Sequence, residues 1–198
     1  MPVNVDLHVH TRFSGDSNIY PKAIVEKLHA DNKIKGVAIT DHDTTQGINS
    51  VRRLAEPYND IVIIPGVEMT TQQGHLIILG IEETLPPPLT VWEAVDFGME
   101  QGGAIIAPHP FRPISGLGET LYEVPVHAIE VLNSHSTNEE NNSALELSKI
   151  KGTSATAGSD CHSIGELLSA YTKVDSEATV DEILNAIKKG NVKPYTPV

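Results

Sequence analysis

Residues 3–10 of the chain read VNVDLHVH, and this stretch decides how the rest of the sequence is interpreted. Apolar residues occupy the odd positions and polar residues the even positions, which is the alternation of a β-strand with one buried face. The imidazoles of His8 and His10 are therefore expected to point the same way, beside Asp6. The stretch predicts a strand that carries two histidines to one place.

Length and composition are typical of one globular domain, which we expect to span residues 1–198, with 39% hydrophobic and 20% charged residues. We find no apolar run long enough for a membrane span and no leader peptide, so we expect a cytoplasmic protein without membrane contact. The single cysteine, Cys161, cannot form an internal disulfide. A formal net charge of −12 would repel a polyanion such as duplex DNA unless bound metal ions reverse the charge locally.

Short apolar segments alternate with helical segments along the chain. The expected strands are residues 3–9, 36–40, 61–64, 76–79, 103–107, 128–132 and 155–158. Capping boxes mark three helix starts, at Thr90 with Glu93, Thr137 with Glu140, and Thr179 with Glu182. Repeated strand and helix units predict an α/β fold with a largely parallel sheet. This pattern alone fits either a closed barrel or a doubly wound open sheet.

In both architectures the active site lies at the carboxyl ends of the parallel strands. Six of the nine histidines lie at the ends of expected strands, namely His8, His10, His42, His109, His135 and His162. Any one of them could be an ordinary buried histidine bonded to a carbonyl. Six together, with the carboxylates Glu68 and Asp160, would compete for hydrogen-bond partners unless a cation lay between them. Imidazole and carboxylate ligands suit zinc, manganese or iron, so the pattern predicts a metal site.

Several motifs resemble the PHP domain, the polymerase and histidinol phosphatase superfamily. The resemblance rests on DLHVHTRFSGD (6–16), TDHD (40–43), GVE (66–68), GHLIILG (74–80), PHP (108–110), EVLNSH (130–135) and GSDCH (158–162). The motifs occur in order over most of the chain. Such a resemblance implies a distorted (β/α)7 TIM-like barrel that hydrolyses phosphoesters with two or three divalent metal ions.

The resemblance also implies a set of ligands for each ion. The first ion would be held by His8, His10, Glu68 and Asp160, the second by Glu68, His109 and His135, and the third by Asp16, His42 and His162. Asp16 lies in a loop that the strand-end argument does not select. Glu68, Asp160 and His162 are expected to take part in catalysis as well, since ions that share a carboxylate can hold a bridging water as hydroxide.

Two arginines lie on the expected catalytic rim, where a planar guanidinium would suit a phosphate. We expect Arg12 and Arg112 to bind substrate, although each could instead form an ordinary surface ion pair. His75 begins the fourth expected strand rather than ending it, so we interpret it as structural or as a support for the ligands. Cys161 lies between two expected ligands and is interpreted as a packing residue.

The leading hypothesis is a metal-dependent phosphatase or phosphodiesterase acting on a small phosphorylated substrate, such as a nucleotide or a sugar or amino-alcohol phosphate. The alternative is a 3'-5' exonuclease or polymerase-associated editing module, which shares the metal chemistry. The negative charge and the few aromatic residues weigh against nucleic acid without excluding it. A non-catalytic, metal-stabilised binding domain is the third interpretation. No oligomeric state follows from the sequence.

Overall fold

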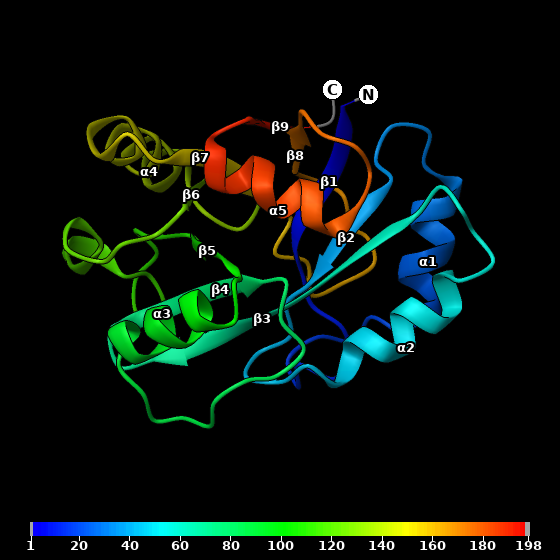
Figure 1. Cartoon of the computed structure of the whole chain (residues 1–198), viewed down its shortest axis with the longest axis horizontal. Coiled ribbons are helices and arrows are strands. Elements are labelled where there is room, and N and C mark those ends of the chain that lie inside the picture. The colour runs from blue at the N-terminus through cyan, green and yellow to red at the C-terminus, as the bar shows by residue number, and fades with distance from the viewer. Residues whose placement is uncertain (1, 197–198) are drawn as a thin grey trace.

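Nine strands form one continuous sheet in the computed structural model, which describes residues 2–196 (Figure 1). The strands are β1 (Val3–Val9), β2 (Gly36–Ile39), β3 (Val62–Thr71), β4 (Gly74–Leu79), β5 (Ala104–Ala107), β6 (Ala128–Asn133), β7 (Ser154–Gly158), β8 (Tyr171–Val174) and β9 (Val192–Tyr195). Their order across the sheet is β7-β6-β5-β4-β3-β2-β1-β8-β9. The first seven strands therefore neighbour one another in chain order, as in a barrel that grows strand by strand.

Five α-helices and one 3-10 helix connect these strands within the described residues. They are α1 (Pro21–Ala30), α2 (Gln46–Ala55), α3 (Val91–Glu100), α4 (Asn138–Lys151) and α5 (Val180–Lys189), with η1 at Gly118–Tyr122. The predicted capping boxes of α3 and α4 are complete. At α5 the Thr179 side chain accepts a hydrogen bond from the Glu182 amide, which is one of the two hydrogen bonds of the predicted capping box. No helix in the described part of the chain is long and apolar enough to cross a membrane.

The sheet is mixed, and its third and fourth strands differ from the sequence prediction. β3 continues past the expected end at residue 64 to Thr71 and forms an antiparallel hairpin with β4, which also pairs antiparallel with β5. Proline and glycine usually interrupt strands, but β3 continues through Pro65 and Gly66. Gly66 instead marks a close approach, since a Cβ there would lie 2.9 Å from the Ile78 carbonyl oxygen on β4. Glu68 therefore lies within a strand and not after one.

Two short strands, β8 and β9, were not predicted. Each has four residues, and both pair antiparallel, β8 with β1 and β9 with β8. Segments this short carry little periodicity, so their pairing depends on the neighbouring strand and not on a local pattern.

The sheet nearly closes on itself, which confirms the barrel and excludes the open doubly wound sheet. The segment after β7 runs beside β1, where the Asp160 amide donates to the His8 carbonyl at 2.8 Å. The His10 amide donates to the Cys161 carbonyl at 3.3 Å, and Val9 and Cys161 form an isolated parallel bridge. Residues 151 or 152 positions apart in the sequence therefore lie side by side.

Apolar clusters cover both faces of the curved sheet. α1 and α2 pack against β2 on one side, and α3 and α4 pack against β3 to β6 on another (Figure 1). Near the beginning of the parallel strands, Val5, Ile64 and Ala104 belong to one apolar cluster with Ile183 and Ile187 of α5. The apolar core thus fills the amino-terminal ends of these strands, and the polar side chains are left to the carboxyl ends.

The register of β1 against β2 shifts between Asp6 and Val9, which modifies the simple alternation expected there. The Asp6 carboxylate accepts from the backbone amides of Ser159 and Leu168, at 2.9 and 3.1 Å. Its burial raises its pKa to about 6, although these hydrogen bonds oppose the rise. Asp6 therefore fastens β1 to the segment after β7.

Gly158 is the position where closure tolerates no side chain. A Cβ there would lie 2.4 Å from His8 Cβ and 3.0 Å from His8 N. We expect Gly158→Ala to lower the free energy of unfolding of the metal-free protein by about 1–3 kcal/mol, the usual cost of overpacking. Urea unfolding measures this.

The matched control is Gly165→Ala, because the nearest atom to a Cβ there is Ser163 Oγ at 4.0 Å. Equal stability of the two variants would contradict the close approach of β7 to β1.

Candidate metal centre

The carboxylate of Glu68 lies at the centre of the polar cluster, with its side chain 1% exposed. Its Oε2 atom lies 3.0 Å from Nε2 of His8 and 3.0 Å from Nε2 of His10. Its Oε1 atom lies 3.0 Å from His109 Nε2 and 2.9 Å from His75 Nδ1. The imidazoles at Oε2 therefore come from the end of β1, and those at Oε1 come from β4 and from the loop after β5.

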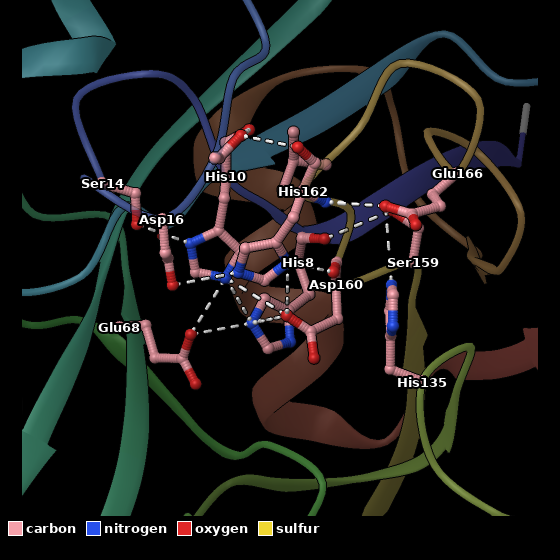
Figure 2. Close-up of polar contacts among 12 residues, drawn as sticks. His8, His10, Ser14, Asp16, Glu68, His135, Ser159, Asp160, His162 and Glu166 are labelled. Carbon is pink, nitrogen blue, oxygen red and sulfur yellow. Dashed lines mark hydrogen bonds and ion pairs between the residues drawn. The ribbon is translucent and has the colours of Figure 1, made fainter.

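The first group of potential ligands is His8, His10, Glu68 and Asp160, all buried (Figure 2). Asp160 Oδ1 lies 3.2 Å from Nε2 of each histidine, and the two Nε2 atoms lie 3.1 Å apart. Ligands about 2.0–2.1 Å from a tetrahedral zinc ion lie about 3.3 Å from each other. The donor atoms of this group already have nearly that spacing.

The second group is His10, Asp16, His42 and His162. Asp16 Oδ2 lies 3.3 Å from His42 Nε2 and 3.2 Å from His162 Nε2. The Asp16 side chain is 48% exposed and that of His162 is 30% exposed, so this part of the cluster faces solvent. The structure thus brings the loop residue Asp16 together with the two histidines that the family resemblance implied.

The third group, His42, Glu68 and His75, includes a residue that the sequence reasoning did not place among the ligands. His75 begins β4, and in a parallel sheet the start of a strand lies far from the active site. β4 is antiparallel to β3, so its start lies beside the carboxyl-terminal half of β3. His75 is part of the GHLIILG motif, but its place beside the other ligands follows only from the direction of β4.

His135 lies in a different environment from the one expected for it. Its Nε2 atom lies 3.6 Å from Glu166 Oε2, and its ring centroid lies 6.0 Å from that of His162. Figure 2 shows His135 beside Glu166, away from the Glu68 carboxylate. Its role as a ligand stays a prediction, and His75 is a second candidate for the same ion.

Two expected ligands have an unusual backbone conformation. The φ angle is 28° at His109 and 54° at Asp160, where side chains other than glycine are uncommon. The amides of both residues donate hydrogen bonds, from His109 to Glu130 Oε2 at 2.9 Å and from Asp160 to the His8 carbonyl at 2.8 Å. Such conformations gather at functional sites, where the surrounding structure maintains them.

The electrostatics of the cluster favour a bound cation. Burial alone would raise the pKa of Glu68, but the nearby imidazoles, His8 first among them, lower it well below its ordinary value. Burial likewise opposes a charge on His10, yet its hydrogen bonds with Asp160 and Glu68 raise its pKa to about 9. The buried carboxylates therefore draw positive charge to this place, whether protons or metal ions supply it.

The residues fit a transition-metal centre by the chemistry of their side chains and by ring nitrogens that lack a hydrogen-bond partner. Among the described residues, the buried Nδ1 atoms of His42 and His109 have no hydrogen-bond partner. Imidazole nitrogens and carboxylate oxygens are the ligands of zinc, manganese and iron. Cys161 is buried in the apolar cluster with α1 and α2, and its burial raises the pKa of the thiol, so it packs as an apolar residue.

The two arginines occupy different places. The Arg112 guanidinium donates to Asn133 Oδ1 at 2.7 Å and forms an ion pair with Asp160, with Nη2 2.8 Å from Oδ2, which puts it against the first ligand group. The Arg12 guanidinium lies over the ring of Tyr20, 4.7 Å from its centroid. Arg112 is therefore the arginine that the structure brings to the cluster.

The chain resembles known proteins over its whole length. A family model described as PHP-associated matches residues 138–192. The uncharacterized protein MJ1587 of Methanocaldococcus jannaschii is 34% identical over 154 residues, 72% of this chain and 90% of the relative. A two-domain protein from Bacteroides vulgatus, containing a predicted PHP-like metal-dependent phosphoesterase, superposes with a TM-score of 0.83 at 20% identity. That superposition covers 99% of this chain and 65% of the two-domain protein, and at this identity it speaks for the fold.

Two further relatives match about two fifths of the chain each. A phosphoribosyl 1,2-cyclic phosphate 1,2-diphosphodiesterase of Eggerthella lenta is 30% identical over 41% of this chain and 32% of its own length. The 5'-3' exoribonuclease Rnm of Escherichia coli is 36% identical over 41% of this chain and 29% of its own length. The chain therefore spans about a third of these two enzymes.

The barrel and the cluster at its carboxyl end define an α/β barrel whose imidazoles and carboxylates could hold a metal ion. The chain belongs to the PHP superfamily, as its ordered motifs indicated. The expectation of a metal-dependent phosphoric ester hydrolase is confirmed at the level of this class.

Glu68 lies within 3.5 Å of five histidines, whereas each potential ligand group has three or four members. Its charge should therefore matter most for metal binding. Loss of a residue that only hydrogen-bonds to a metal ligand weakens metal affinity by up to about a hundredfold. Glu68 is itself an expected ligand, so we expect Glu68→Gln to weaken metal affinity by at least that factor. Metal content of the purified protein, by mass spectrometry of the elements, measures it.

Glu146→Gln, on the exposed side of α4, is the control with the same chemical change. A Glu68→Gln protein that retains as much metal as this control would contradict the central place of Glu68.

Proposed function

We propose that this chain hydrolyses a phosphoester of a small molecule, such as a nucleotide or a sugar or amino-alcohol phosphate, at the Glu68 cluster. The observation that carries the proposal is the convergence of buried carboxylates and imidazoles on Glu68, with an arginine beside them. The names of the partial relatives, a cyclic phosphodiesterase and an exoribonuclease, support phosphorus as the reacting centre. We further propose a cytoplasmic location, which a lone buried cysteine supports.

We propose the ligands of two or three zinc, manganese or iron ions as follows. One ion would be held by the group His8, His10, Glu68 and Asp160, and another by the group Asp16, His42 and His162. Glu68, His109 and either His135 or His75 would hold a further ion. The distances of these side chains from Glu68, Asp160 and Asp16 support the groups.

Bound ions would supply a nucleophile from water at neutral pH and would stabilise charge on the phosphoryl oxygens. The protein side chains have their own tasks. Glu68 and Asp160 set the negative charge that retains the cations, and their burial keeps that charge unscreened. Arg112 presents its guanidinium beside Asp160, where its remaining N–H groups can bind a phosphate oxygen. Arg12 is the more peripheral of the two phosphate-binding candidates.

A second candidate function is the trimming of an RNA or DNA end. The match to exoribonuclease Rnm favours it. The formal net charge of −12 and the small number of aromatic residues oppose it, since nucleic-acid tracks are basic and stack bases on aromatic rings. The edge formed by Asp16 and His162 is partly exposed to solvent and does not favour either substrate over the other.

One panel of substrates separates these functions. Protein loaded with zinc, manganese or iron is given a generic phosphomonoester, a phosphodiester, a nucleoside cyclic phosphate and a short single-stranded RNA with labelled ends. We expect the small esters to be hydrolysed and the RNA to remain. Loss of labelled terminal nucleotides from the RNA, with inert small esters, would favour the second function. An inert panel with every metal would leave a metal-stabilised binding domain.

Removing Glu68 should affect turnover as well as metal binding. We expect Glu68→Gln to lower kcat on the best ester of the panel by at least about a hundredfold, since several kcal/mol of charge stabilisation depend on the metal and each 1.36 kcal/mol is tenfold. The measurement uses saturating metal, with Glu146→Gln as control. Unchanged hydrolysis by Glu68→Gln would make the cluster irrelevant to the reaction.

Arg112 should act mainly on substrate binding. Arg112→Lys keeps the positive charge beside Asp160 but removes the planar fork, so we expect KM to rise about tenfold with little change in metal content. Steady-state kinetics and metal analysis check this. Arg53→Lys, on the exposed face of α2, is the matched control. An unchanged KM would assign Arg112 to the support of Asp160 alone.

A further inference from the structure

We propose that Glu130 is a positioning residue, which fixes the nitrogen that His8 offers to a metal ion and holds the backbone of His109. The proposal rests on the metal centre described above and not on the ester that is hydrolysed. Glu130 is a buried carboxylate in the middle of β6, 2% exposed, between the apolar residues Ile129 and Val131. None of the potential ligand groups includes it.

The carboxylate of Glu130 faces the rear of the His8 ring. Its Oε1 and Oε2 atoms lie 3.2 and 3.4 Å from His8 Nδ1. The other ring nitrogen, Nε2, lies 3.0 Å from Glu68 Oε2 and 3.2 Å from Asp160 Oδ1, inside the first ligand group. An ionised carboxylate can only accept hydrogen bonds, so Nδ1 must carry the proton. When the ring carries this proton alone, as a metal ligand must, the lone pair of His8 is on Nε2, which is the atom that faces the other ligands.

The same carboxylate reaches a second expected ligand. Oε2 accepts from the backbone amide of His109 at 2.9 Å, at the residue whose φ angle is 28°. The His109 ring in turn lies 3.0 Å from Glu68 Oε1. Glu130 therefore joins the end of β1 to the loop after β5, through one side chain and one backbone group.

The surroundings leave Glu130 little freedom. Its Oε2 atom also accepts from Asn133 Nδ2 at 2.8 Å. A Cβ atom at Gly158 would lie 2.6 Å from Oε1, so the glycine on β7 makes room for the carboxylate. A carboxylate that contacts a ligand in this way is a common means of orienting metal-binding histidines.

An amide at position 130 cannot make the same set of contacts. In Glu130→Gln the single side-chain oxygen would have to serve the His109 amide and Asn133 Nδ2, as Oε2 does now. The side-chain NH2 group would then face His8 Nδ1 and donate to it. His8 would have to carry its proton on Nε2, where it would block a metal ion.

The experiment compares Glu130→Gln with Glu130→Asp in zinc affinity, measured by competition with a chromogenic chelator and without any ester. We expect Glu130→Gln to weaken zinc binding about 10- to 100-fold. Glu130→Asp should bind zinc more tightly than Glu130→Gln, because it keeps a group that only accepts, although it loses a methylene. A packing role predicts the opposite order, since glutamine preserves the shape.

The control is Thr156→Val, at the β7 position that pairs with Glu130 in the sheet. Thr156 is 1% exposed and donates from Oγ1 to the Ile129 carbonyl, so its replacement disturbs the same layer without touching a ligand. We expect unchanged zinc affinity for this variant. Thermal unfolding of each metal-free variant checks that it is folded.

A second measurement uses the unmodified protein. In the zinc-loaded form, nitrogen-15 correlation spectra of the histidine rings should show His8 with its proton on Nδ1. A proton on Nε2 of His8, or equal zinc affinity of Glu130→Gln and the unmodified protein, would overturn the proposal. These readouts involve no substrate, so failure of the proposed ester hydrolysis would leave the result for Glu130 intact.

Discussion

A carboxylate buried at the end of a barrel is the constraint on which the arrangement of this chain depends. Glu68 is 1% exposed, and an isolated charge at such a place costs several kcal/mol. Its oxygens are matched by imidazoles from β1, from β4 and from the loop after β5. Each of these segments must keep its position in the sheet for the charge to remain compensated. A shift of any one of them would therefore disturb both the fold and the site.

Closure of the sheet is what completes this match. Asp160 follows β7, at the far end of the sheet order, and reaches His8 and His10 only because the chain after β7 returns to β1. This approach places the Asp160 backbone in a conformation that is uncommon for residues other than glycine, with a φ angle of 54°. The apolar packing of α5 against the strand beginnings supplies stability at the opposite end. Among residues 2–196, three of the five non-glycine residues with positive φ, Asp43, His109 and Asp160, are expected ligands or adjoin one.

Local patterns in the sequence predicted the features that local forces determine. The pairing of His8 and His10 on β1, the capping boxes of α3 and α4 and the strand-end positions of His42 and Asp160 all follow from neighbours in the chain. His75 could not be found in this way, because its position depends on β4 running antiparallel. The same holds for the short strands β8 and β9, whose pairing is decided by the neighbouring strand.

Glu130 shows that a local sequence pattern can mark a residue as unusual without identifying its partner. In the sequence it interrupts an apolar strand, which marks it as unusual but does not identify its partner. That partner, His8, lies 122 residues away and is reached only across the closed barrel. A polar residue within a buried strand is costly unless its acceptors are used, so such a residue predicts an unseen partner. Three-dimensional closure alone tells which one.

The charge of the cluster is graded from inside to outside, which explains how an acidic chain could attract an anionic ester. Glu68, Glu130 and Asp160 are almost fully buried and turn their charge toward the imidazoles. Asp16 and His162 lie at the exposed edge, and the Arg112 side chain, 25% exposed, stands beside Asp160. The buried carboxylates would be neutralised by cations, while the guanidinium remains partly open to solvent. A phosphate would therefore meet the Arg112 guanidinium beside Asp160 and any bound cations, although the chain as a whole is negative.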